Sequence, residues 1–390
     1  MKSSDRIEIR IYKDNDWEIL KDYIQKNWRS DHPFCNKSLF DWQFRGYGNN
    51  NNKSLLLLHN NVVVGFRGII PSLYQIPYEN NKMKVVEGGS IAFWKVADKY
   101  QGVSGLKLQS KANESLLVMT GSGGKERALK VLQIFFGFSV MELANRYVIP
   151  LDVKGYHNLL RNKVDISQIK EWTTNVLRGS KDHMPSDCPD INIIAEVWKK
   201  TTFPIGIFSL YRNDEFWKWR YKDSKGFKYY FFGNVEKEGL IIARIENTIS
   251  EENRELQGRG VFRIIEVIPS NIRAWKGEGD SLLVELIRGA ILWAREQDCI
   301  AVDFCCSTSR FEPVMKSAGF RNASIECSAP ICSMAILFQP LDYISRPINY
   351  YYRINLPEKG FIRPNFDNTY MVKSEGDQDR PNMVTNCFNS

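Results

Sequence analysis

The two halves of the chain repeat the same series of local sequence features. An aromatic segment around Trp42 has a counterpart around Trp219, 177 residues further on, and two apolar runs follow each of them. A Gly-Phe pair closes each series, beginning at Gly137 and at Gly319, which are 182 residues apart. Because several features recur in the same order at nearly the same offset, the sequence predicts a duplicated domain. A length of 390 residues also exceeds the usual size of one hydrophobic core.

Hydrophobic periodicity predicts alternating strands and helices in the first half. Apolar residues at helical spacing follow an Asp-rich cap, and the pair Asn60-Asn61 accepts the positive φ values of a tight hairpin. We expect strands at residues 6–12, 54–59, 62–71, 84–96 and 116–119, and helices at residues 17–28, 39–45 and 104–115. Gly88-Gly89 interrupts the fourth strand and predicts a place where a substrate approaches the backbone closely.

Residues 94–105 join an apolar strand to a small-residue turn and then to a helix. The first turn of a helix presents backbone N–H groups without intrahelical partners, and its dipole favours negative charge. A strand, turn and helix N-terminus in this order can therefore hold the phosphates of a nucleotide or coenzyme.

This order resembles the acetyl-coenzyme A binding core of the GNAT-type N-acyltransferases. Their signature is Gln or Arg, two residues, Gly, one residue, and Gly or Ala, with Gly-Phe closing the next helix. Gln101 matches its first position, whereas Ser104 and Leu106 replace the two signature glycines and Gly105 stands one place early. The resemblance implies acetyl-CoA or another acyl-CoA as co-substrate. The coenzyme-binding residues that it implies are Trp94, Val96, Gln101, Gly102, Val103, Ser104 and Gly105.

The resemblance also implies an α/β (α+β) fold with two GNAT-like domains, each a mixed, mostly antiparallel central sheet flanked by helices. We expect a first domain at residues 1–150, a linker at 151–190 and a second domain at 191–345. The second copy has Ala274 where the signature has Gln or Arg, so the first domain is expected to bind acyl-CoA and the second to be degenerate. Residues 346–390 are expected to form a solvated tail.

Acyl transfer to an amine needs a proton acceptor and a proton donor beside the thioester. In this family the base is often a carboxylate near the strand before the signature, which implies Glu87. The family's acid is commonly a tyrosine four residues before the Gly-Phe glycine, but this chain has Gln133 and Met315 there. Three options follow: another acid such as Tyr147, catalysis without a protein acid, or no catalysis.

We interpret the chain as an acyl-CoA-dependent N-acyltransferase, in the first instance an N-acetyltransferase, that acts on a small amine such as an amino sugar. Its acceptor cleft is predicted to include His32, Phe34 and Glu87. One alternative is a Fem-type aminoacyl-tRNA-dependent transferase, which shares the duplication. Another is a GNAT-like binding module without catalysis, which the missing tyrosines favour.

The net charge of +8 suits an anionic ligand, but it is spread along the chain without a long basic run, so nucleic acid is not an expected partner. No CxxC pair occurs, and no metal is expected. The N-terminal residues lead directly into a strand and no apolar run is long enough to span a membrane, which predicts a cytoplasmic protein without a membrane partner. Asp303 and Glu266 lie on apolar strands, where a carboxylate is either paired or lines a cleft.

Overall fold

The computed structural model describes residues 7–47, 51–124, 126–141, 144–177, 183–326, 341, 348–376, 379 and 381. Its α-helices are α1 (Trp17–Asn27), α2 (Lys37–Arg45), α3 (Val103–Ser115), α4 (Glu126–Phe136), α5 (Val153–Leu159), α6 (Ile166–Leu177), α7 (Ile191–Thr202), α8 (Asp214–Trp217), α9 (Ser281–Glu296) and α10 (Glu312–Ser317). The strands of the first half are β1 (Ile7–Ile11), β2 (Leu55–His59), β3 (Val62–Tyr78), β4 (Lys82–Val96), β5 (Val118–Ser122), β6 (Ser139–Met141) and β7 (Asn145–Pro150). Those of the second half are β8 (Ser209–Leu210), β9 (Tyr230–Phe232), β10 (Leu240–Asn247), β11 (Gly260–Ile268), β12 (Cys299–Cys306), β13 (Arg321–Asn322) and β14 (Tyr350–Ile354).

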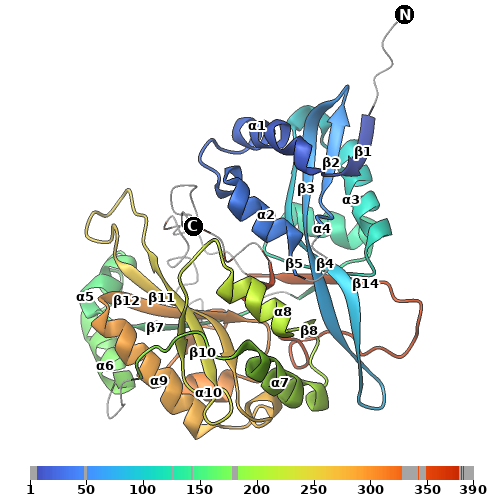
Figure 1. Cartoon of the computed structure of the whole chain (residues 1–390). Coiled ribbons are helices and arrows are strands. Elements are labelled where there is room, and N and C mark those ends of the chain that lie inside the picture. Colours follow the sequence, from blue (N-terminus) through green and yellow to red (C-terminus); the bar gives the residue numbers. More distant parts are fainter. Residues whose placement is uncertain are drawn as a thin grey trace, which may run out of the picture.

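These strands form two mixed sheets (Figure 1). The first sheet has the order β1-β2-β3-β4-β5-β14-β6, with β8 paired to β3, and the second has the order β13-β7-β12-β11-β10-β9. Each sheet has one parallel pair, β4 with β5 and β11 with β12, and its other pairs are antiparallel. The predicted fold class of mixed, mostly antiparallel sheets flanked by helices is confirmed.

The two sheets exchange one strand each. Strand β7 ends the first half of the chain but pairs with β12 and β13 of the second sheet. Strand β14 follows the second half and pairs with β5 and β6 of the first sheet. In both sheets the exchanged strand therefore occupies the same place, between the second strand of the parallel pair and the short edge strand.

This exchange means that the expected boundaries at residues 150 and 345 do not separate the two sheets. Residues 145–150 belong to the second sheet, α5 and α6 occupy about half of the expected linker, and the expected tail supplies β14. The expectation of a solvated tail is corrected at Glu375 and Asp379, which are buried. The alternation of apolar and polar residues shows which face of a strand is buried, but it does not show which strand pairs with it. The exchange of β7 and β14 was therefore not predictable from the local sequence.

Buried leucines at residues 55–58 show how the first sheet is covered. Leu56 and Leu58 pack with the cluster that contains residues of α1 and α2, whereas Leu55 and Leu57 pack with residues of α3 and α4. Successive side chains of a strand point to opposite faces, so this run is apolar because both faces are covered. The sheet is thus placed between two pairs of helices.

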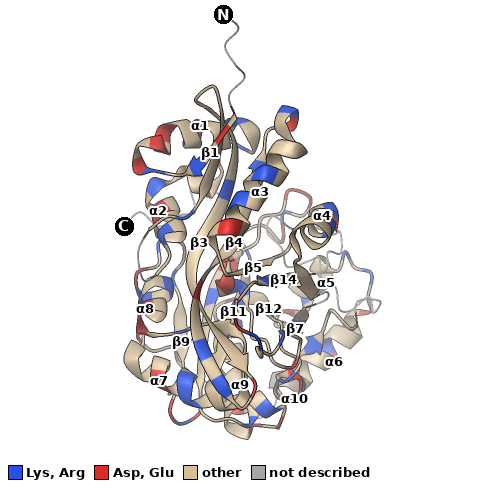
Figure 2. Ribbon diagram, turned by 90° about the vertical axis from the view of Figure 1, so that its right-hand side faces the viewer, with Lys and Arg blue, Asp and Glu red and all other residues tan. Residues whose placement is uncertain are grey.

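The long strands β3 and β4 extend from the part of the molecule that contains α1 toward the part that contains α9 (Figure 2). Their hairpin partner β2 joins β3 through Asn60 and Asn61, both at positive φ as predicted. Among the described residues, no helix is both long and apolar enough to cross a membrane.

Candidate functional site

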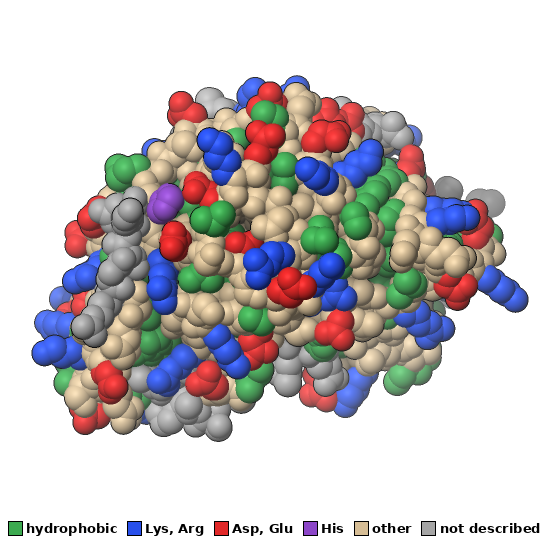
Figure 3. Space-filling view, turned by 90° about the horizontal axis from the view of Figure 1, so that it is seen from below, with side chains coloured by type: hydrophobic (Ala, Val, Ile, Leu, Met, Phe, Trp, Pro, Cys, Tyr) green, Lys and Arg blue, Asp and Glu red, His purple; other side chains and the backbone are tan. Residues whose placement is uncertain are grey.

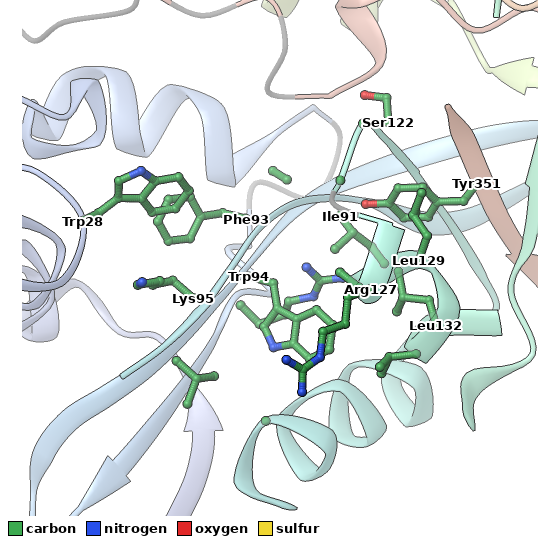
Figure 4. A pocket seen from close by; sticks show the side chains of 18 of the residues that line it. Trp28, Ile91, Phe93, Trp94, Lys95, Ser122, Arg127, Leu129, Leu132 and Tyr351 are labelled. Atoms are coloured by element: carbon green, nitrogen blue, oxygen red, sulfur yellow. The ribbon is translucent and has the colours of Figure 1, made fainter. Parts of the chain in front are cut away.

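Strands β4 and β5 lie side by side for only a short distance. The ladder between them joins Gly88, Gly89 and Ser90 of β4 to residues 118–120 of β5 and ends there. Beyond this point, residues 91–96 of β4 line one side of a cavity of about 1030 Å³. Ser122, the glycines that follow it and residues of α4 line the cavity as well (Figure 4). The divergence of the two strands therefore opens a site large enough for a small-molecule ligand.

The N-terminus of α3 lies at this cavity. Gly102 is the cap residue at φ +85°, it provides no side-chain hydrogen bond to the helix, and a Cβ added there would meet no atom within 4 Å. Gln101, Gly102 and Gly105 line the cavity, and Val103 and Ser104 form the first turn between them. The first N–H groups of α3 thus lie at the cavity without a side-chain cap from Gly102, which is the arrangement that binds phosphate.

The corresponding helix of the second half, α9, is closed at this end. Its cap residue Asp280 accepts a hydrogen bond from the backbone N–H of Leu283 at 3.2 Å. A carboxylate already fills the position where a phosphate would bind. Only the first of the two turns is therefore open to an anion, although both carry glycines.

Positive charge dominates the cavity. Among the residues that the structure describes, the lining includes one carboxylate, Glu246, together with six basic residues: Arg67, Lys95, Arg127, Arg244, Arg263 and Lys373. Arg127 stands on the first turn of α4, and basic residues are visible on α3 and α4 in Figure 2. The excess of positive charge attracts a polyanionic ligand.

A β-bulge lies in the wall of the cavity at Ala92. On β3, Gly68 pairs with Phe93 and the next residue, Ile69, pairs with Ile91, so Ala92 has no partner in the ladder. A bulge re-aims the backbone groups of the extra residue. Ala92 lines the cavity, so its backbone is placed to contact a ligand there. Sequence reasoning missed this feature because bulges have no residue signature in a buried strand.

Tyr351 of β14 also lines the cavity, although sequence reasoning assigned it to the tail. Its phenol points from β14 toward the cavity in Figure 4, and its ring packs in the cluster of α3 and α4 residues. Gly121 makes room for it, because a Cβ at that position would lie 2.4 Å from the ring. Tyr350 and Tyr352 point to the opposite face and join another cluster. The sequence feature that could have identified this strand is the run of these three consecutive tyrosines.

His32 and Phe34 lie behind the cavity wall and do not line it. Both are buried, and His32 Nδ1 accepts a hydrogen bond from the Phe34 backbone N–H at 3.2 Å. Their rings pack against Phe93, and the His32 ring also packs against Trp28, with centroids 4.8 Å apart. Trp28 and Phe93 are the residues of this aromatic group that line the cavity (Figure 4).

Glu87 and Tyr147 are placed outside the cavity lining. Glu87 lies before the point where β4 and β5 separate, and its mostly exposed carboxylate is 3.5 Å from Lys53 Nζ. Gly88 beside it serves packing: a Cβ there would lie 2.4 Å from the Val118 carbonyl oxygen. Tyr147 is fully buried in β7, stacked on Phe304, and burial raises its pKa. Neither Glu87 nor Tyr147 lies at the cavity, and the catalytic roles predicted for them stay predictions.

The two carboxylates left open by the sequence are paired rather than exposed to solvent. Asp303 accepts hydrogen bonds from Arg146 at 3.0 Å and Arg263 at 2.7 Å. Burial opposes its ionisation, but the surrounding cations, Arg263 foremost, leave the pKa of Asp303 lowered. Glu266 accepts hydrogen bonds from Tyr221 and Tyr370, each at 2.9 Å. Neither carboxylate is among the residues that line the cavity.

No protein-family model and no curated protein matches this sequence. The fold, however, matches solved structures of N-acyltransferases. A GCN5-related N-acetyltransferase from Anabaena variabilis ATCC 29413 is 13% identical with a TM-score of 0.52, over 90% of this chain and 73% of the other. Saccharomyces cerevisiae N-myristoyltransferase, crystallised with myristoyl-CoA and inhibitors, is 12% identical with a TM-score of 0.56, over 98% of this chain and 87% of the other. A probable N-acyltransferase from Enterococcus faecalis V583 is 11% identical with a TM-score of 0.52, over 90% of this chain and 73% of the other.

These likenesses extend over nearly the whole chain and so include both sheets. The class that they define is the GNAT-like fold in a two-domain arrangement, which confirms the predicted resemblance at the level of fold. At such low identity the likeness establishes the fold, and the activity has to be argued from the site.

Proposed function

We propose that this protein is an acyl-CoA-dependent N-acyltransferase. The observation that supports it best is the open N-terminus of α3 beside a basic cavity. Coenzyme A has a pyrophosphate and a further phosphate at one end and a long neutral arm at the other. The uncapped N–H groups of residues 103–105 and the guanidinium of Arg127 would hold the phosphates. The neutral arm would run along residues 91–96 of β4.

The thioester supplies an activated acyl group, and the residues of this chain would organise its transfer. In the transfer, the amine nitrogen bonds to the acyl carbon and the carbon–sulfur bond breaks. The backbone at the Ala92 bulge would stabilise the negative charge that develops on the carbonyl oxygen. The hydroxyl of Tyr351 would donate a proton to the departing sulfur, in the role that the family's missing tyrosine leaves vacant. The nitrogen that has bonded to the acyl carbon would lose its extra proton to solvent, and the Tyr351 phenolate would regain one from solvent, so that an amide and a free thiol result.

The proposed acceptor is a small amine, with an amino sugar as the first class to test. The position of Glu246 supports the proposal of an amine acceptor, because its carboxylate belongs to the described cavity lining and can attract an ammonium group. Burial raises the Glu246 pKa, but the stronger combined effect of Arg244 and Arg263 leaves it lowered, so the carboxylate stays ionised at neutral pH. The amine would react in its neutral form after it loses a proton to solvent.

The alternative of a tRNA-dependent transferase needs an extended basic surface. The face in Figure 3 shows Lys and Arg interspersed with Asp and Glu, and the basic residues do not gather into one patch there. The concentration of cations inside a cavity, rather than along an extended surface, favours a small polyanion over a nucleic acid.

Release of free thiol from acetyl-CoA, measured with a panel of amines and with longer acyl-CoA donors, tests this proposal. We expect release that depends on both the donor and an acceptor, and a matching increase in the acceptor mass. Stabilisation by acetyl-CoA without turnover on any amine would instead indicate the binding module. If tRNA stays bound through purification, and acetyl-CoA neither stabilises the protein nor is turned over, the result would indicate a tRNA-dependent transferase.

A further inference from the structure

The part of the cavity wall that comes from the second sheet is a buried group of charges. Arg244 and Glu246 stand on β10, Arg263 stands opposite Arg244 on β11, and Lys373 comes from the C-terminal segment. The side chains of Arg244 and Arg263 are each about 2% exposed. This part of the wall is separate in sequence from the α3 and α4 residues proposed to hold the coenzyme phosphates.

Each of the three cations is held in place by neighbours outside the cavity. Arg263 donates to Asp303 at 2.7 Å and also to Glu246. Lys373 donates to the same oxygen of Asp303 at 3.5 Å. Arg244 donates through Nε to Asp379 at 2.7 Å, and its guanidinium lies 3.6 Å from the centre of the Phe227 ring. The positions of these cations are therefore fixed before any ligand binds.

Arg244 shares both of its carboxylates with other cations. Asp379 also pairs with Arg220 at 3.2 Å, and Glu246 also pairs with Arg263. A second nitrogen of Arg244, Nη1, is 3.3 Å from Glu246 but has no hydrogen-bond partner with suitable geometry among the described residues. A buried N–H without a partner costs free energy that a ligand acceptor atom would recover. Because Arg244 lines the cavity, that atom would come from a molecule bound there.

We propose that the acceptor carries an anionic group, a carboxylate or a phosphate, in addition to its amine. Arg244, Arg263 and Lys373 bind the anionic group, and Glu246 attracts the ammonium. A planar guanidinium suits both kinds of anion, since it donates parallel hydrogen bonds to two oxygens. This inference rests on the proposed function and narrows the acceptor class to amines such as amino acids or amino-sugar phosphates.

Matched pairs of amines test the inference on the unmodified protein. Calorimetry in the presence of saturating unacylated CoA compares glucosamine 6-phosphate with glucosamine, and an amino acid with its amide. We expect the charged member of at least one pair to bind at least tenfold more tightly, and the pair concerned tells phosphate from carboxylate. Equal or weaker binding of the charged member in both pairs overturns the inference. The proposed function would survive that result if neutral amines are acetylated.

The variant Arg244→Gln separates acceptor binding from coenzyme binding. We expect at least a tenfold loss of affinity for the anionic amine, with unchanged affinity for CoA. The matched control is Arg220→Gln, which removes the other cation paired with Asp379 but does not line the cavity. If Arg244→Gln weakened CoA binding and Arg220→Gln did not, Arg244 would be assigned to a coenzyme phosphate. That result would overturn the inference. If either variant fails to fold, the matched amine pairs on the unmodified protein still decide the question.

Discussion

Trp42 and Trp219 bind each other through two reciprocal hydrogen bonds. The indole N–H of Trp42 donates to the carbonyl oxygen of Trp219, and the indole N–H of Trp219 donates to the carbonyl oxygen of Trp42, each at 2.8 Å. The two rings are stacked with centroids 5.4 Å apart. A contact in which residue i binds j as j binds i is the mark of a two-fold relationship. The aromatic repeat seen in the sequence therefore lies where the two halves meet.

This reciprocity predicts that the two tryptophans contribute equally to stability. Trp42→Phe and Trp219→Phe each remove one N–H donor and keep most of the ring. Each should lower the free energy of unfolding by about 1 to 2 kcal/mol, since a backbone carbonyl loses its partner. The urea midpoints of the two variants measure this. A difference between them much larger than about 0.5 kcal/mol would show that the contact is not symmetric in energy.

Replacing Val103 by Asp should separate folding from coenzyme binding. Val103 is exposed and stands at the first position of α3, where a carboxylate interacts favourably with the helix dipole, so we expect unchanged or slightly raised thermal stability. The same carboxylate would repel the phosphates and raise the Kd for acetyl-CoA by about tenfold or more. Val103→Asn provides a neutral control of the same shape. If both variants bind equally well, the phosphates do not lie at this helix end.

Tyr351→Phe removes the proposed proton donor and keeps the ring beside Gly121. We expect kcat to fall by about 10² to 10⁴-fold with little change in KM for the donor, because the hydroxyl is needed as the thiolate leaves. Tyr352→Phe is the control from the same strand, since its hydroxyl donates to the Pro364 carbonyl oxygen at 3.0 Å, away from the cavity. Equal activities of the two variants would leave Tyr351 with a packing role.

Glu375 makes stability fall as the pH rises toward neutrality. Burial raises its pKa to about 7; Arg212 opposes the rise and Glu266 adds to it. Between its ordinary value near 4.5 and about 7, the folded protein keeps a proton that the unfolded chain releases. The free energy of unfolding should therefore decrease by a few kcal/mol, on the order of 1.4 for each pH unit, across this window.

Glu375→Gln tests this dependence because its amide stays neutral at every pH. We expect the slope of stability against pH between about 5 and 7 to flatten in this variant. Glu358→Gln is the surface control, since Glu358 is an exposed partner of Lys84, and it should keep the slope. Asp303 and Asp379 have lowered pKa values, so their contributions are lost only in more acidic solution. A slope that survives in Glu375→Gln would require another group to explain it.

Local sequence patterns predicted the elements and the turn at α3. Periodicity places the helices and strands, and the strand, turn and helix order around Gly102 identifies the cavity wall, because both depend on neighbours in the sequence. The repeat at Trp42 and Trp219 indicated the duplication.

The other half of the site depends on contacts between distant residues. Tyr351 reaches the cavity only because β14 joins the first sheet, and Asp379 is buried only because Arg220 and Arg244 meet it from 159 and 135 residues away. In the sequence, Asp379 belongs to a polar stretch that is typical of a solvated tail. Its buried partners are decided by tertiary packing, and a single sequence contains no local record of them.

Titration of the unmodified protein with acetyl-CoA by calorimetry tests whether the cavity beside α3 binds an acyl-CoA. We predict one binding site with a Kd below about 1 mM, weakened by Val103→Asp and retained by Val103→Asn. Trp94, which lines the same cavity, should change its fluorescence over the same concentration range. Absence of binding at millimolar acetyl-CoA, or binding that Val103→Asp leaves unchanged, would contradict this prediction.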